Sequence, residues 1–192
     1  MLSYGDVVDA WDRADPRHIH PSRDESEQSY WDSGRCQAQQ LDRAFRGVGV
    51  DGTVLDYGCG DGRVAIPMAD LGWHVVAADT SPRMLARLRS HAGDTVEVAD
   101  AAALPQVDAA YCLAVLIHHS YVDARRIVQR VADAVRPGGL LVLDWPVSDQ
   151  PRERGGWIEV TTWAAPQRSE AAAGCGLEPA DIGLPWSTWR RT

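Results

Sequence analysis

Residues 54–63, Val54-Leu55-Asp56-Tyr57-Gly58-Cys59-Gly60-Asp61-Gly62-Arg63, carry the strongest structural signal in the chain. An apolar run with one acid leads into three glycines at alternate positions, and a helical pattern follows. This order predicts a buried strand, a tight turn and the start of a helix. Glycine suits such a turn because it adopts positive φ and has no Cβ to obstruct a ligand. The first N–H groups of the helix then offer hydrogen-bond donors, so we expect a ligand-binding turn.

Two kinds of ligand are compatible with a glycine-rich turn of this type. The dinucleotide fingerprint G-x-G-x-x-G, counted from Gly58, needs glycine where this chain has Arg63. Asp56 inside the strand would also repel a pyrophosphate, whereas it would attract a cationic ligand. Residues 55–62 resemble the first motif of class I S-adenosylmethionine (SAM) dependent methyltransferases. The resemblance implies that the methionine end of SAM lies over this turn.

Composition limits the alternatives. A chain of 192 residues that is 45% hydrophobic predicts one domain, with no apolar run of membrane-spanning length and hence no membrane partner. The first residues lack an apolar leader, and the four cysteines are scattered without a C-x-x-C pair, so we expect a cytoplasmic protein. The net charge of −8 argues against a nucleic-acid partner.

Strand and helix patterns alternate along the rest of the chain. Together with the resemblance they predict an α/β fold: a Rossmann-like, doubly wound, mostly parallel seven-stranded sheet with a final antiparallel strand. We expect an N-terminal helical lid or cap over residues 1–48 and a SAM-binding core over residues 49–192. The expected helices cover residues 4–12, 24–47, 63–71, 122–135 and 162–175, and further strands cover 74–79, 95–100, 107–115, 140–144, 177–184 and 186–191. The run Arg136-Pro137-Gly138-Gly139 is expected to end the fourth of these helices.

Acids follow two of the predicted strands. Asp79 lies 21 residues after Gly58, which in a doubly wound sheet brings its carboxylate beside the glycine turn, where it can accept both ribose hydroxyls of a nucleoside. Asp79 could instead cap the next helix, but Ser81 followed by Pro82 already supplies that cap. Asp100 with Ala101 matches the family position that contacts the adenine ring; the alternative is a turn-forming aspartate.

The resemblance implies further cofactor contacts. Tyr30 would belong to the lid, Thr80 and Met84 continue the D-x-S-x-x-M pattern in which Met packs on adenine, and the end of the fourth strand would border the methyl group. The implied SAM site comprises Tyr30, Asp56, Gly58, Cys59, Gly60, Asp79, Thr80, Met84, Asp100, Ala101, Leu113, Ala114 and His118. The product formed from the cofactor would be S-adenosylhomocysteine (SAH).

Candidate catalytic and acceptor-binding residues come from position and chemistry. His118 and His119 follow the fourth strand and titrate in the range that suits a general base, although they can equally serve as pocket or structural residues. His20 is a weaker candidate. Trp31, His119 and Trp145 are candidate acceptor-binding residues, and core packing is the alternative for each tryptophan. The histidines have no carboxylate at ligand spacing, so we predict no metal site.

The sequence thus predicts a SAM-dependent methyltransferase that transfers a methyl group, by in-line displacement, to an O, N, S or C nucleophile of a small molecule. Two alternatives stay open. One is a methyltransferase that acts on a protein or nucleic acid. The other is a catalytically silent SAM-binding regulatory or scaffold protein, because intact cofactor residues report binding alone. The pattern leaves the oligomeric state open.

Overall fold

A seven-stranded sheet forms the centre of the molecule. The computed structural model describes residues 3–13, 26–153 and 160–192. The sheet order is β3-β2-β1-β4-β5-β7-β6, with β1 to β5 paired in parallel and β7 antiparallel to both of its neighbours. This confirms the predicted mostly parallel sheet. The strands are β1 (Thr53–Tyr57), β2 (His74–Ala78), β3 (Glu97–Val98), β4 (Val107–Cys112), β5 (Val135–Leu143), β6 (Leu177–Ala180) and β7 (Ser187–Arg191).

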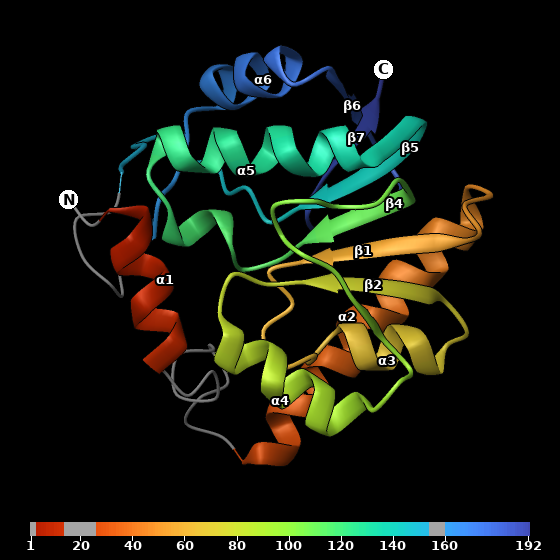
Figure 1. The fold of residues 1–192 in the computed structure, drawn as a ribbon. Helices are drawn as coiled ribbons and strands as arrows, with labels where there is room; N and C mark the ends of the chain where they lie inside the picture. Colours follow the sequence, from red (N-terminus) through yellow and green to blue (C-terminus); the bar gives the residue numbers. More distant parts are fainter. Residues whose placement is uncertain (1–2, 14–25, 154–159) are drawn as a thin grey trace.

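Helices cover both faces of the sheet. Figure 1 shows α5 and α6 on one face, α2, α3 and α4 on the other, and α1 beside the carboxyl ends of the strands. The helices are α1 (Tyr4–Arg13), α2 (Glu27–Gly47), α3 (Ala65–Asp70), α4 (Pro82–Ala92), α5 (Tyr121–Ala134) and α6 (Ala165–Gly174), with a short 3-10 helix η2 (Leu116–His118) before α5. Within the described ranges, no helix combines the length and the apolarity that crossing a lipid bilayer requires.

Two hydrophobic clusters, one on each face, hold the layers together. Successive residues of a strand point to opposite faces. Leu55 of β1 accordingly packs in the cluster that contains Ile127 of α5, whereas its neighbour Val54 packs in the cluster that contains Phe45 of α2. The alternation explains why β1, which lies between β2 and β4, is apolar on both sides apart from Asp56.

Helix α2 belongs to the sheet-covering layer. Its N-cap is Ser26, whose hydroxyl accepts the Ser29 N–H at 3.3 Å, and its buried face includes Ala38, Leu41 and Phe45. These side chains share a cluster with β1 and β2, so α2 is built into the core. The division of the chain at residue 48 into a lid and a core stays a prediction. Helix α1 is the helix that lies beside the carboxyl ends of the strands, where a lid would cover a ligand.

Three local differences from expectation have backbone causes. Strand β4 ends at Cys112 because Ala114 has φ 57°, which breaks the extended conformation. Gly138, with φ 83°, lies inside β5 rather than before it, in a stretch where the register with β4 shifts. Helix α3 has six residues, and Pro67 is tolerated in its first turn, where an N–H has no intrahelical acceptor anyway.

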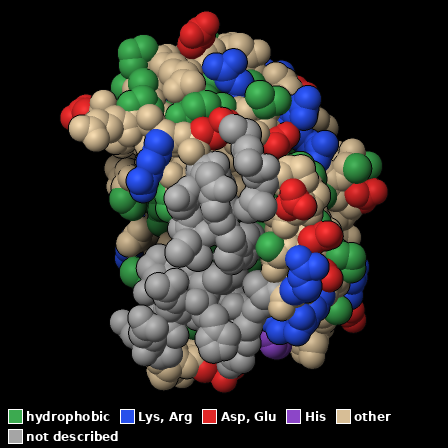
Figure 2. Space-filling model, turned by 90° about the vertical axis from the view of Figure 1, so that its left-hand side faces the viewer, with side chains coloured by type: hydrophobic (Ala, Val, Ile, Leu, Met, Phe, Trp, Pro, Cys, Tyr) green, Lys and Arg blue, Asp and Glu red, His purple; other side chains and the backbone are tan. Residues whose placement is uncertain are grey.

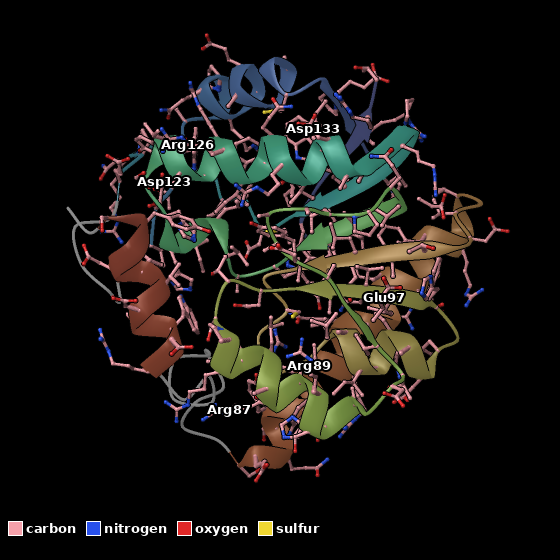
Figure 3. All side chains as sticks on the ribbon, in the orientation of Figure 1. Arg87, Arg89, Glu97, Asp123, Arg126 and Asp133 are labelled. Atoms are coloured by element: carbon pink, nitrogen blue, oxygen red, sulfur yellow. The ribbon has the colours of Figure 1, made fainter. Side chains whose placement is uncertain are left out.

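The outer helix faces carry charge. Figure 3 shows Asp123 and Arg126 side by side on α5, where their carboxylate and guanidinium are 3.1 Å apart, and Arg87 and Arg89 on α4. Arg126 is mostly exposed. Such solvent-exposed pairs contribute little to stability. The buried clusters, rather than these pairs, therefore account for the fold.

Candidate functional site

A cavity of about 370 Å³ lies at the carboxyl ends of the central strands and beneath α1. Figure 2 looks onto this end of the molecule, and acidic and basic side chains are intermixed around its margin. In doubly wound sheets ligands bind at this edge, where the strand order reverses, here between β1 and β4. The lining residues that the sequence predicted are Tyr30, Asp56, Gly58, Cys59, Gly60, Asp79, Thr80, Met84, Leu113, Ala114, His118 and His119.

The glycine turn is closed against the end of β2. The N–H groups of Gly58 and Cys59 both donate to the Ala78 carbonyl, at 2.7 and 3.2 Å. Gly58 and Gly60 have φ of 79° and 55°, which favour glycine. A Cβ at Gly58 would collide with the Val115 side chain, whereas a Cβ at Gly60 would enter open space. The backbone at Gly60 is therefore bare on the cavity side.

Asp79 is held in place by the turn. Its two carboxylate oxygens accept the N–H groups of Gly60 and Ser81, at 2.9 and 2.8 Å. Burial raises the pKa of Asp79, and these backbone hydrogen bonds oppose the rise. The predicted cap is present as well, because the Ser81 hydroxyl accepts the Met84 N–H at 3.1 Å. Asp79 therefore lines the cavity while Ser81 caps α4.

Next to the turn, the ionisable side chains of Asp56 and Arg63 are both buried and both line the cavity. Asp56 is 5% exposed, and burial raises its pKa to about 7, against the opposing effects of Tyr111 and Arg63. Arg63 is 8% exposed, donates to the Ser33 hydroxyl at 3.0 Å and lies over the Tyr30 ring. Arg63 was not among the predicted site residues, although its place directly after the glycines and before α3 (Ala65–Asp70) is visible in the sequence.

The histidines that follow β4 contact α1. The His119 ring stacks on Tyr4 with centroids 5.3 Å apart, and the His118 ring meets Trp11 edge-on at 5.0 Å. The His119 carbonyl accepts the Thr161 hydroxyl at 2.7 Å. Both candidate bases thus lie on the cavity wall. The α1 contribution was missed, although the helical spacing of the apolar residues was available; it comprises Tyr4, Val7, Val8 and Trp11.

Helix α1 is fastened to the start of α4. One Asp12 oxygen accepts the Ser81 hydroxyl at 2.6 Å and the Arg83 N–H at 3.1 Å. The Arg83 guanidinium in turn donates to the carbonyls of Asp12 and Arg13, each at 3.2 Å. Ser81 lies two residues after Asp79, so the helix that covers the cavity is anchored close to the carboxylate predicted to bind ribose.

Four predicted site residues do not line the cavity. Asp100 is exposed and its carboxylate accepts the Ala102 N–H at 2.8 Å, which is the turn-forming alternative, and Ala101 packs in the core. Trp31 packs edge-on against Tyr30 and His91. Trp145 is buried in the core because Asp144, one residue earlier, is the side chain that faces the cavity. His20 lies outside the described residues.

The aromatic residues that line the cavity are not the predicted Trp31 and Trp145. Tyr4 and Trp11 of α1, Tyr57 of β1 and Trp186 before β7 line the cavity. Trp145 instead packs against Trp163 and Trp189 within the core. The aromatic rings that line the cavity come from α1, β1 and the segment before β7, which lie far apart in the sequence.

The lining residues fit a sulfonium nucleoside. Asp79 offers a fixed carboxylate beside a backbone that carries no side chain at Gly60, and the buried Met84 offers an apolar surface. Asp56 and Asp79 supply negative charge for cationic groups, and Arg63 supplies positive charge for a carboxylate. A ligand with a ribose, a sulfonium and an amino-acid end carries each of these complements.

Comparisons with known proteins agree with this geometry. Residues 54–139 match the family described as a methyltransferase domain. An uncharacterised methyltransferase of Mycobacterium tuberculosis is 33% identical over 159 residues, which cover 82% of this chain and 56% of that protein. The chain therefore spans just over half the length of that relative.

Solved structures show the same fold. The magnesium protoporphyrin IX methyltransferase of Synechocystis PCC 6803, with bound SAM, has a TM-score of 0.74 at 19% identity and covers 100% of this chain and 99% of its own. The 1,6-didemethyltoxoflavin-N1-methyltransferase of Burkholderia thailandensis has a TM-score of 0.70 at 18% identity, with 100% and 92% covered. The chain is therefore similar to a methyltransferase domain over residues 54–139, and its fold is that of class I methyltransferases solved with bound SAM or SAH.

Proposed function

We propose that the protein is an enzyme that transfers the methyl group of SAM to a nucleophilic atom of a small molecule. The observation that carries the proposal is the cavity itself. It joins the glycine turn and Asp79 to a region enclosed by α1, η2 and Trp186. The same cavity thus has the features of a nucleoside site and, near α1, apolar and aromatic side chains that suit an acceptor.

Each end of the cofactor has a candidate partner in this proposal. Asp79 accepts the ribose hydroxyls, Arg63 binds the carboxylate of the methionine part, and Thr80, Met84 and Tyr30 surround the remainder. Leu113 and Ala114, just after β4, border the methyl group. The contact of Asp100 and Ala101 with adenine stays a prediction, supported by their position after β3, the strand next to β2.

The chemistry depends mainly on positioning. SAM supplies a methyl carbon activated by the sulfonium, so the protein has to align the nucleophile and exclude water. The apolar side chains of α1 cover the cavity and serve the second purpose. His118 and His119 lie on the same wall and are the candidate proton acceptors for a nucleophile that carries a proton.

A small acceptor is favoured over a macromolecule because α1 encloses the cavity. Two proteins of similar fold are named for small acceptors, a magnesium porphyrin and a toxoflavin precursor. The net charge of −8 also opposes binding to nucleic acid.

Calorimetry with SAH tests the cofactor site. Wild-type protein is expected to bind SAH, and Asp79→Ala is expected to lower the affinity by about ten- to a hundred-fold, the value of hydrogen bonds to a charged group. Asp149→Ala, an exposed aspartate outside the cavity, is the control. Unchanged affinity in Asp79→Ala would contradict the ribose assignment.

Transfer itself is tested by SAH formation from SAM with a panel of amines, phenols and thiols. Production above background with at least one small acceptor supports the proposal. Tight SAH binding without turnover on any small acceptor would instead support a silent SAM-binding protein.

A further inference from the structure

Asp144 is a half-buried carboxylate that lines the cavity and was not among the predicted site residues. It directly follows β5, and its side chain lines the cavity at the end of that strand. One of its oxygens accepts the Ala114 N–H at 3.3 Å. The paired strands β4 and β5 therefore end with Asp144 beside the segment proposed to border the methyl group.

The backbone at Ala114, whose N–H donates to Asp144, is in a strained conformation. Ala114 has φ 57°, the one left-handed non-glycine residue within the described ranges. A conformation of this kind costs of order 1 kcal/mol and persists where the surrounding structure demands it, often at functional sites. Here the next residue, Val115, lies directly over Gly58. The strained segment thus connects the glycine turn to Asp144.

The negative charge of Asp144 lacks a cationic partner within the described part of the chain. Burial raises its pKa, and the Ala114 N–H is what opposes the rise. Arg63 is the one arginine among the described lining residues, and its guanidinium donates to Ser33. An ionised carboxylate in such a place is costly unless a cation or a proton neutralises it. A ligand group that is positively charged or donates a proton would therefore complement Asp144.

Aromatic rings share the cavity with Asp144. Tyr4 and Trp11 of α1 and Trp186 before β7 all line it. Aromatic faces attract ammonium groups and also pack against apolar or planar ligands. A half-buried carboxylate in a cavity that aromatic rings also line suits an ammonium group on an apolar body. An anionic acceptor would meet the carboxylates of Asp144 and Asp79 without a free counter-charge.

We infer that Asp144 binds the amino group of the acceptor, and that the acceptor class is an amine carried on an apolar or aromatic body. This inference rests on the proposed methyl transfer. It assigns the reacting nitrogen to the space between Asp144 and the Leu113–Ala114 segment. Asp144 both orients the nitrogen and accepts its proton, and the two histidines complete the wall.

The proton and electron balance is simple. The ammonium proton passes to the Asp144 carboxylate, leaving a neutral amine and a neutral carboxylic acid. The nitrogen lone pair then forms the bond to the methyl carbon while the carbon–sulfur bond breaks and its electron pair stays on sulfur. The products are an N-methylammonium ion and the neutral thioether SAH. Asp144 returns its proton to water when the product leaves.

Binding of benzylammonium to the SAH complex tests the inference without relying on turnover. The readout is the ¹⁵N–¹H spectrum, in which the Ala114 amide reports directly on Asp144. Benzyl alcohol and benzoate serve as neutral and anionic probes of similar shape. Asp144→Asn keeps the size of the side chain and an oxygen that can accept the Ala114 N–H. Asp149→Asn makes the same chemical change at an exposed position outside the cavity.

We expect benzylammonium to bind the wild-type SAH complex, to shift the Ala114 amide and to bind more tightly than benzyl alcohol or benzoate. Asp144→Asn should weaken benzylammonium by about ten-fold or more, as for loss of a charged hydrogen-bond partner, and leave benzyl alcohol unchanged. Asp149→Asn should behave as the wild type.

Three results would overturn the inference. They are no benzylammonium binding to the wild-type complex, equal affinity in Asp144→Asn, and a preference for benzyl alcohol or benzoate over benzylammonium. The SAH titration separates this failure from failure of the proposed function. If the wild type does not bind SAH, the proposed function fails; if SAH binds wild type and Asp144→Asn alike but benzylammonium does not respond, only the assignment of Asp144 fails.

Discussion

Three carboxyl groups line the cavity: Asp56 lies within β1, Asp79 directly follows β2, and Asp144 directly follows β5. Burial raises the pKa of each, because the ionised form loses hydration. Backbone N–H groups oppose this rise at Asp79 and Asp144, whereas Tyr111 and Arg63 do so at Asp56. Ionising these carboxyl groups therefore costs free energy in the protein without ligand. A ligand that brings positive charge would reduce that cost.

Asp56 provides a pH test at the residue scale. Its pKa rises from an ordinary 3.8 to about 7 in the folded protein. Between these pH values the folded protein keeps a proton that the unfolded chain has lost, so stability falls as pH rises through this window. The loss approaches about 4 kcal/mol above pH 7, taking about 1.4 kcal/mol per pKa unit. Urea unfolding across this range should show the loss in the wild type.

The control for this prediction is Asp56→Asn, which cannot ionise. The difference in unfolding free energy between the variant and the wild type should grow in favour of the variant as pH rises towards 7. Asp149→Asn, an exposed site, should track the wild type at every pH. Parallel pH profiles for wild type and Asp56→Asn would contradict the assignment of a raised pKa to this carboxyl group.

At the scale of elements, α2 is locked to the glycine turn by a close backbone approach. A Cβ at Gly34 would collide with the Arg63 carbonyl oxygen and lie 2.7 Å from Arg63 Cγ. Glycine inside a helix is otherwise unfavourable by about 1 kcal/mol relative to alanine. The close approach therefore explains why a glycine occupies the middle of α2, and it ties that helix to the segment that carries Arg63.

Gly34→Ala should destabilise the protein by about 1–3 kcal/mol, because backbone has to move to admit the methyl group. Gly47→Ala is the matched control on the same helix, since a Cβ there would meet no atom within 4 Å. Denaturant unfolding should place Gly47→Ala at or above the wild type. A Gly34→Ala protein as stable as the wild type would show that α2 does not approach Arg63 this closely.

Helix α1 is the other element with a testable attachment. Asp12→Ala removes the acceptor for the Ser81 hydroxyl and the Arg83 N–H. Amide hydrogen exchange in α1 should become faster, and SAH should dissociate about two- to ten-fold faster, the range for loss of a typical intramolecular hydrogen bond. Asp9→Ala, exposed on the same helix, should change neither rate. Equal effects of the two substitutions would show that the Asp12 hydrogen bonds to Ser81 and Arg83 do not specifically hold α1 in place.

At the scale of the whole molecule, cofactor binding should raise thermal stability. SAH at about one hundred times its Kd stabilises the folded state by about 2.7 kcal/mol. For a chain of this size that corresponds to a Tm increase of about 5–10 °C. Differential scanning fluorimetry measures the shift, and Asp79→Ala at the same SAH concentration should shift less. A wild-type Tm that does not respond to SAH would count against the site as a whole.

The strand and turn assignments followed from local patterns. The apolar run before the turn, the glycines at 58, 60 and 62, and the Ser81–Pro82 cap are properties of short segments, and the chain forms them as expected. Several elements are shorter than expected, among them β3, β6, α3 and α6, and in some places long-range packing overrides a local pattern. The bulged start of β5 and the short β4 are of this kind, because pairing between those two strands decides where each begins and ends.

The sequence by itself determined the fold class, the glycine turn and the position of Asp79, because each depends on residues close together in the chain. The tertiary structure alone decided that α1 covers the histidines, that Arg63 lies against α2, and that Asp144 rather than Trp145 faces the cavity. The physical reason is separation along the chain. Ala114 and Asp144 meet because the sheet brings the ends of β4 and β5 together, and Tyr4 meets His119 because α1 packs over that end of the sheet. No local pattern encodes either contact.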